Sequence, residues 1–137
     1  MAILSLTVRI FKNKWFARFA EKEGITDSVL REVVDQLEVR QAEADLGGDV
    51  YKVRIARPGE GKSGGNRVIV FFKSEKRTFF VYGFAKSERD NIDQGELRAF
   101  KYRAKDTFSM TEEHIEDRLR NGTLIEVLQE DGHEVQK

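Results

Sequence analysis

The chain contains no cysteine, one proline and two histidines in 137 residues. Without cysteine it has neither a disulfide framework nor thiolate chemistry, which favours a reducing compartment. No stretch approaches the roughly 18 consecutive apolar residues that span a bilayer. The first residues lack the basic segment and the cleavage site of a signal peptide. We therefore expect a cytoplasmic protein with no membrane segment.

Two familiar kinds of chemical site also lack their residues. His114 and His133 have no partner at the spacing of metal ligands, so we expect no metal site and no cofactor. The segment that ends in Gly61-Lys62-Ser63 superficially resembles a phosphate-binding P-loop. However, Ala56 stands where that pattern needs its first glycine, and a strand follows where it needs a helix. The sequence therefore argues against ATP binding.

Charge is plentiful but unevenly distributed. The formal net charge is zero, with 24 Lys/Arg and 24 Asp/Glu. From Val50 to Asp90 there are ten Lys/Arg against four Asp/Glu, whereas from Lys105 to Lys137 there are four against nine. Such segregation is typical of a polyanion-binding surface followed by an acidic tail, although ordinary surface charge also explains the composition.

The first third of the chain predicts a strand and two helices. Polar and apolar residues alternate from Ile3 to Ile10, as in a half-buried strand. Asn13 is placed to cap a helix that Gly24 ends, and Thr26 opens a second helix that runs towards Gly47-Gly48. Apolar residues at helical spacing predict the buried faces. The residues expected in the core are Trp15, Phe16, Phe19, Ala20, Val29, Leu30, Val33, Val34 and Leu37.

The middle of the chain predicts three antiparallel strands over 50–57, 67–73 and 78–84. The second of them is apolar on both faces, which places it centrally in the sheet. Asn91 or Asp93 caps a third helix that buries Leu97, Phe100, Ala104 and Phe108. Ser109 and Glu112 form a capping box for a fourth helix, which Asn121-Gly122 ends. Residues 123–128 form a last short strand or an extended tail.

The cations of the middle region converge on these strands. Lys52 and Arg54 are two residues apart and therefore share one strand face, and Arg67 opens the neighbouring strand. This arrangement predicts a polyanion site, because solvated strand positions explain only two or three of its members. The remaining members are Arg57, Lys62, Lys86 and Arg89.

Three segments carry a resemblance to a known family. They are KWFARFAEKEGI (residues 14–25), ADLGGDVYKVRIARPGEGKSGGNRVIVFF (residues 44–72) and FVYGFAKSERDNI (residues 80–92). In this order they resemble toxins of the RelE/ParE superfamily from type II toxin–antitoxin systems, specifically the RelE/HigB type. The resemblance covers roughly residues 9–104. It implies an α+β fold in which a strand and a two-helix hairpin pack on a small antiparallel sheet, with helices at the C-terminus.

The resemblance also implies an activity, namely metal-independent cleavage of mRNA on the ribosome. In such endoribonucleases the 2′-hydroxyl attacks the adjacent phosphate and leaves a 2′,3′-cyclic phosphate. By position, Lys52 and Arg54 match the family's basic pair, and Arg67 matches the arginine that opens the next strand. The implied roles are general base for Lys52, phosphate clamp for Arg67 and general acid for Lys86. The implied partners are mRNA, the ribosome and a cognate antitoxin, which in HigB-type pairs is often a helix-turn-helix protein.

Part of the family pattern is missing. Ser87 and Asp93 fall where relatives carry an arginine and an RNA-stacking tyrosine. Tyr51, Tyr82 and Phe84 are aromatic residues that could stack a base, although core packing also explains each of them. Two other functions therefore stay open: a ParE-like inhibitor of DNA gyrase, and an RNA-binding regulator without catalysis.

We divide the chain into a RelE-like domain over 1–108 and an acidic extension over 109–137. One hypothesis is that the extension folds over the basic face and restrains it. The alternative is that it adds a helix and a strand to the sheet or to the antitoxin interface.

Overall fold

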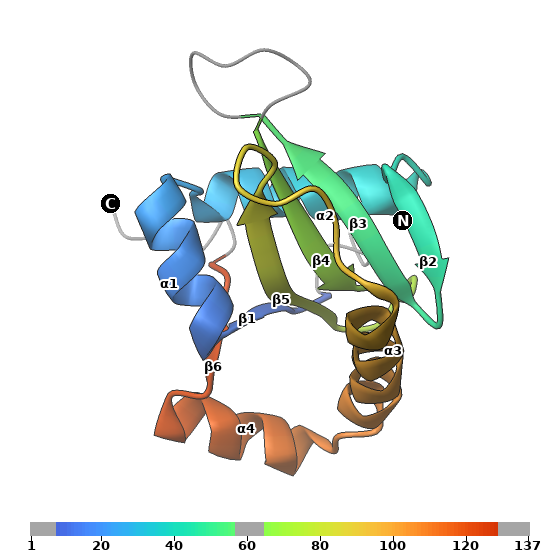
Figure 1. The fold of residues 1–137 in the computed structure, drawn as a ribbon. Coiled ribbons are helices and arrows are strands. Elements are labelled where there is room, and N and C mark those ends of the chain that lie inside the picture. Colours follow the sequence, from blue (N-terminus) through green and yellow to red (C-terminus); the bar gives the residue numbers. More distant parts are fainter. Residues whose placement is uncertain (1–7, 57–64, 129–137) are drawn as a thin grey trace.

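The computed structural model of the protein describes residues 8–56 and 65–128. They form a six-stranded sheet in the order β2-β3-β4-β5-β1-β6, with four helices (Figure 1). The predicted α+β class is thereby confirmed. None of the described helices is long and apolar enough to cross a membrane. The strands are β1 (Ile10–Asn13), β2 (Ala44–Gly47), β3 (Val50–Ile55), β4 (Asn66–Phe71), β5 (Thr78–Ala85) and β6 (Leu124–Glu126), and the helices are α1 (Lys14–Glu23), α2 (Asp27–Glu38), α3 (Gln94–Phe108) and α4 (Glu112–Asn121).

Local signals set most helix ends. The Asn13 side chain accepts a hydrogen bond from the Phe16 backbone N–H at 2.7 Å, and Thr26 caps α2 in the same way. Gly24 ends α1 in the left-handed conformation that glycine adopts without strain. Asp93 and Glu96 form a full capping box at the start of α3. These ends therefore agree with the sequence prediction.

The sheet carries a hydrophobic core on each face. Strand β4 lies inside the sheet and is buried at every position, as predicted. The first core joins the sheet to α1 and α2 through residues such as Phe16, Leu30 and Phe80. The second joins it to α3 and α4 through Ile69 and Phe100, among others. Figure 1 shows α2 behind the sheet and α3 in front of it. Each buried Phe or Leu contributes about 1.5–3 kcal/mol of transfer free energy.

Several predicted boundaries are wrong. The described N-terminal strand covers residues 10–13 rather than ending at Ile10, and it runs parallel to β5, so the sheet is mixed. The second helix ends at Glu38, well before Gly47-Gly48. Both glycines have positive φ, but Gly47 is the last residue of β2, and Gly48 forms the turn to β3 together with Asp49. Strand β3 ends at Ile55 rather than Arg57.

The predicted capping box of α4 is also wrong. Thr111 and His114 form it, in place of Ser109 and Glu112. The His114 Nδ1 accepts from the Thr111 backbone N–H at 3.2 Å, a role usually taken by Glu or Gln. Because imidazole is a less common partner than a carboxylate, the glutamate pattern misled the prediction by two residues.

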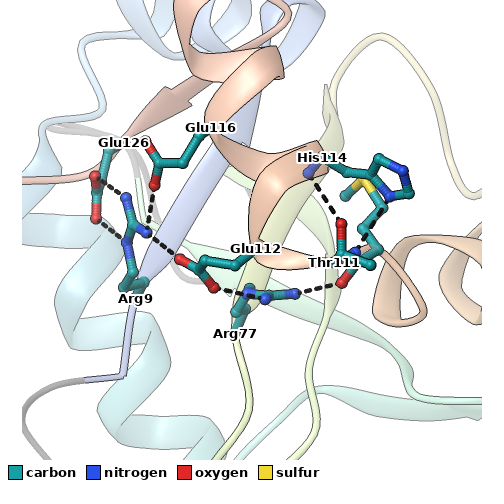
Figure 2. A network of polar contacts seen from close by, with 8 residues as sticks. Arg9, Arg77, Thr111, Glu112, His114, Glu116 and Glu126 are labelled. Carbon is teal, nitrogen blue, oxygen red and sulfur yellow. Dashed lines mark hydrogen bonds and ion pairs between the residues drawn. The ribbon is translucent and has the colours of Figure 1, made fainter.

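The C-terminal segment completes the far edge of the sheet. Strand β6 pairs antiparallel with β1, so residues 123–128 contain the short strand that was one of the two predicted alternatives. Figure 2 shows the ion pairs that the glutamates of this segment form with Arg9 and Arg77. Arg9 makes two 2.8 Å bonds to Glu126 and also binds Glu112 and Glu116, while Arg77 binds Glu112 at 2.8 Å.

The acids of this segment therefore do not cover the basic strands. Three of its glutamates bind Arg9 and Arg77, and β6 is the strand furthest in the sheet from β2 and β3. Within residues 109–128 the hypothesis of a restraining tail is wrong, and extension of the sheet is confirmed. Residues 129–137 lie outside the described part of the chain.

Candidate nucleic-acid interface

Three of the predicted site residues lie together on one face of the sheet. Arg54 on β3 stands directly opposite Arg67 on β4, and Lys52 lies two residues earlier on the same face. Like charges at directly opposed strand positions destabilise a sheet. The fold therefore maintains a costly arrangement at this point, which a bound anion would relieve.

Arg67 is held in place by an acid that the sequence did not single out. Its side chain is only 8% exposed, and its Nε lies 2.7 Å from Oε1 of Glu43. The second oxygen of Glu43 is 3.8 Å from Nζ of Lys52. Glu43 immediately precedes β2, a strand that was not predicted, so no local pattern placed it beside the cations. It reaches them because Ala44 pairs with Lys52 in the β2–β3 register.

Arg54 has a polar atom without a hydrogen-bond partner. Its Nη1 is buried, and within the described part of the chain it makes no hydrogen bond. Leaving a charged donor buried and unpaired costs more than the 1–3 kcal/mol of a neutral one. Arg54 lines a cavity of about 470 Å³. The cavity is lined by Gln36, Gln41, Ala42, Glu43, Val53, Arg54 and Arg67. Its two arginines make it a fitting receptor for a phosphate group.

The loop after β5 brings the remaining described cations towards this face. Figure 1 shows this loop, in yellow, passing in front of the sheet on its way to α3. Lys52 Nζ donates to Oδ1 of Asn91 at 3.2 Å, and Arg89 Nε donates to the Asn91 backbone oxygen at 2.9 Å. Asn91 thus joins β3 to the loop, although the sequence suggested it only as a possible helix cap.

Lys86 and Arg89 are themselves engaged. Lys86 Nζ binds Asp90 Oδ1 at 2.7 Å, and this hydrogen bond lowers the pKa of Asp90, with a smaller contribution from Lys52. Arg89 binds Glu96 and donates to the Tyr82 hydroxyl at 2.8 Å. Its bond to Glu96 lowers the pKa of that carboxyl. Lys86 therefore lies within electrostatic reach of the strand cations, while Arg89 braces the start of α3. Arg57 and Lys62 lie outside the described residues.

Comparison with protein-family models gives a match that includes all of this geometry. Residues 8–127 match the family described as the RelE toxin of the RelE / RelB toxin-antitoxin system. The chain belongs to the RelE toxin family. It is therefore a toxin of a toxin–antitoxin system, and the family implies a cognate antitoxin as its partner. The match extends beyond residue 108, so it includes α4 and β6, while our division of the chain at that residue stays a prediction.

The aromatic residues of this RelE toxin divide between the two faces of the sheet. Tyr51 packs edge-on against Phe72 on the face covered by α1 and α2, which removes it from the cationic face. Tyr82 and Phe84 lie on the cationic face, and the Arg89 guanidinium sits 5.8 Å from each ring centroid. Trp15 was predicted to be buried but is 47% exposed. Its ring stacks on Tyr82 at the open edge of β5 instead of entering the core.

No group of three His, Asp or Glu side chains in the described ranges is arranged to hold a metal ion. His114 caps α4, and His133 lies beyond the described residues. The acid–base candidates are Lys52 and Glu43, which lie near each other beside Arg67, and Lys86, which directly follows β5.

Proposed function

We propose that this RelE-family toxin is an endoribonuclease that cleaves mRNA on the ribosome. The observation that carries the proposal is the opposed pair Arg54 and Arg67. Both side chains line the same cavity, and Nη1 of Arg54 is buried without a hydrogen bond among the described residues, so one phosphate could bind both guanidinium groups. Phosphoryl transfer gathers negative charge on the non-bridging oxygens, and preorganised cations stabilise that charge. The chemistry needs positioning and charge more than covalent help from the protein.

In the proposed reaction the RNA supplies its own nucleophile. The 2′-oxygen forms a bond to the adjacent phosphorus as the bond from phosphorus to the 5′-oxygen breaks, which yields a 2′,3′-cyclic phosphate and a 5′-hydroxyl. One side chain accepts the proton of the 2′-hydroxyl, and another gives a proton to the 5′-oxygen. Lys86 is our candidate for the second role, because its side chain is 34% exposed and lies in the loop that Lys52 contacts through Asn91.

Two side chains compete for the proton-accepting role. Lys52 takes it by resemblance, but its contacts to Asn91 and Glu43 are those of an ammonium. Glu43 pairs with Arg67 and becomes free to accept a proton if the RNA phosphate replaces it there. Lys52→Arg keeps the charge but cannot act as a base, and Glu43→Gln keeps the shape without the carboxylate. The variant that loses kcat with an unchanged KM identifies the base, because an electrostatic role for Lys52 survives replacement by arginine.

The activity is tested with purified toxin and ribosomes that carry a defined mRNA. We expect cleavage products with a 5′-hydroxyl, mapped by primer extension and shown by phosphorylation with polynucleotide kinase. Arg67→Ala should lower the cleavage rate about 10²–10³-fold, as expected for loss of one preorganised donor to the developing charge. Cleavage by Arg67→Ala at the wild-type rate would contradict the proposed site.

The two alternative functions predict different results when the protein is expressed in cells. A gyrase inhibitor would induce the DNA-damage response and leave mRNA intact, and a non-catalytic regulator would retard RNA in gels without cutting it. The buried side chain of Arg67 and the buried Nη1 of Arg54 favour RNA, since contact with a protein surface does not require desolvated phosphate-binding groups. We also propose that the antitoxin covers the cationic face or its edge with acidic or apolar segments.

A further inference from the structure

Trp15 is the only tryptophan of the chain, and nearly half of its surface faces solvent. An exposed tryptophan is unusual, because burying its ring contributes more than burying almost any other side chain. The ring is not loose, however. It stacks on Tyr82 with centroids 4.6 Å apart and on Phe19 at 5.5 Å.

The start of α1 is pinned to the edge of β5, which fixes the place of Trp15. The Asn13 side chain caps α1 and donates to the Val81 carbonyl at 3.1 Å. One turn after Trp15, Phe19 lies over Gly83 so closely that a Cβ there would be 2.4 Å from Phe19 Cε2. The contacts of Asn13 and Phe19 with β5 therefore fix α1 before and after Trp15, and they keep its ring exposed.

A continuous row of side chains connects Trp15 to Arg67 at the proposed phosphate site. Tyr82 contacts Phe84, with centroids 6.3 Å apart, and Phe84 stands opposite Arg67 in the β4–β5 register. Arg89 fixes the Tyr82 hydroxyl at 2.8 Å and lies over both rings. The exposed ring thus lies on the same surface as the cationic pair.

The exposed side of α1 next to Trp15 is basic. Lys14, Arg18 and Lys22 follow one another at intervals of four residues, so they form a stripe along the helix. All three are exposed, and no carboxylate of the described residues forms an ion pair with them. An exposed aromatic ring beside unpaired cations is the combination by which proteins hold single-stranded RNA.

We propose that Trp15, supported by Tyr82, stacks an unpaired nucleobase of the RNA that lies next to the cleaved phosphate, while Lys14 and Arg18 contact its backbone. The inference rests on the proposed function, because it takes RNA as the ligand. The basic stripe favours RNA over an apolar segment of a protein partner.

The single tryptophan gives a direct test in the full-length protein. Its fluorescence is recorded while a 2′-O-methyl RNA oligonucleotide, which cannot be cleaved by 2′-hydroxyl attack, is added. We expect saturable quenching by the RNA and none by inorganic polyphosphate, which offers charge without bases. Equal quenching by polyphosphate, or unchanged emission in the presence of bound RNA, would overturn the proposal.

Variants provide the second arm. Trp15→Ala should bind the oligonucleotide about 5- to 100-fold more weakly, as for other base–aromatic stacks, and Trp15→Phe should bind within about threefold of the wild type. Tyr102→Ala is the matched control, because Tyr102 is 75% exposed on α3 and should leave affinity unchanged. Wild-type affinity in Trp15→Ala would refute base stacking. Quenching without cleavage on ribosomes would refute the proposed enzyme alone, whereas cleavage without quenching would refute this inference alone.

Discussion

At the scale of single residues, the cationic face combines one satisfied arginine with one unsatisfied arginine. Arg67 has Glu43 as its partner, whereas Nη1 of Arg54 is buried without a hydrogen bond among the described residues. The two residues oppose each other on neighbouring strands. Such an unpaired donor is tolerated where a ligand completes it, so stability and function should respond in opposite directions to its removal.

Replacement of Arg54 by methionine tests this idea. Methionine keeps much of the aliphatic volume and removes both the unpaired donor and the repulsion with Arg67. We expect the free energy of unfolding to stay constant or to rise by about 1 kcal/mol, while RNA affinity and cleavage fall at least about tenfold. Urea unfolding and oligonucleotide binding measure the two effects.

Arg67→Met is the matched control, since it removes the shorter of the two ion pairs of Glu43 and should lower both stability and activity. A large loss of stability in Arg54→Met would show that Arg54 has a structural role instead.

At the scale of elements, the contact between α1 and β5 sets the geometry of the proposed RNA surface. Gly83 lacks a side chain on the face where Phe19 packs. The helix can therefore approach the strand closely enough for Trp15 to reach Tyr82 around the strand's edge. A substitution at Gly83 should therefore alter the position of Trp15, although Gly83 is not part of the proposed RNA surface.

Gly83→Ala should destabilise the protein by about 1–3 kcal/mol, because the new methyl group would overlap the Phe19 ring. It should also weaken RNA binding and shift the Trp15 emission, since α1 must move. Thermal unfolding and fluorescence measure both.

Gly95→Ala is the control within the same chain. A Cβ at Gly95 has Asp93 Oδ1 at 3.5 Å as its nearest neighbour, and alanine favours the helix there by about 0.5–1 kcal/mol. If Gly83→Ala were as stable as wild type with unchanged emission, the close contact would not set the helix position.

At the scale of the whole molecule, Arg9 connects the beginning of the described chain to its end. It binds Glu112, Glu116 and Glu126, which are more than 100 residues away in sequence (Figure 2). Its hydrogen bond with Glu126 is the largest cause that raises the pKa of Arg9, so it stays charged at any ordinary pH. Strand β6 and helix α4 thereby stay attached to the sheet by charge as well as by backbone pairing.

The pH dependence of this attachment has a defined sign. The hydrogen bond from Arg77 holds the pKa of Glu112 below its ordinary value of 4.5, with Arg9 contributing less. Because the folded pKa is the lower one, the stabilisation is fully present above about pH 4.5. It is lost as the pH falls through the lowered value.

We expect Arg9→Gln to lower the melting temperature at pH 7, because three glutamates then repel one another without their shared cation. Wild type and variant should converge as the pH falls through the lowered pKa of Glu112, because its carboxylate then takes up a proton. Thermal unfolding at a series of pH values measures this. Arg120→Gln, which removes an exposed pair with Asp117, should change little at any pH. A difference in melting temperature for Arg9→Gln that persists at pH 3 would contradict an electrostatic attachment.

Much of the fold could be predicted because its signals are local. Asn13, Thr26 and Asp93 cap helices through contacts within three residues, and alternation alone placed Lys52 and Arg54 on one strand face. The continuous apolar run of β4 was enough to place it inside the sheet. These features depend only on residues that are close in sequence, so the sequence alone is enough to predict them.

The sequence by itself thus determined the fold class, most helix ends and the convergence of Lys52, Arg54 and Arg67. Only the tertiary structure decided that Glu43 meets Arg67, that β6 pairs with β1 and that Trp15 remains exposed. Each of these depends on segments distant in sequence. Glu43 reaches the site through an unpredicted strand. Trp15 lies outside the core because Phe16 and Phe19 of α1 face the sheet, whereas Trp15 contacts Tyr82 around the edge of β5. An apolar residue on a helix favours burial, but the packing of that helix against the sheet decides whether the residue is buried.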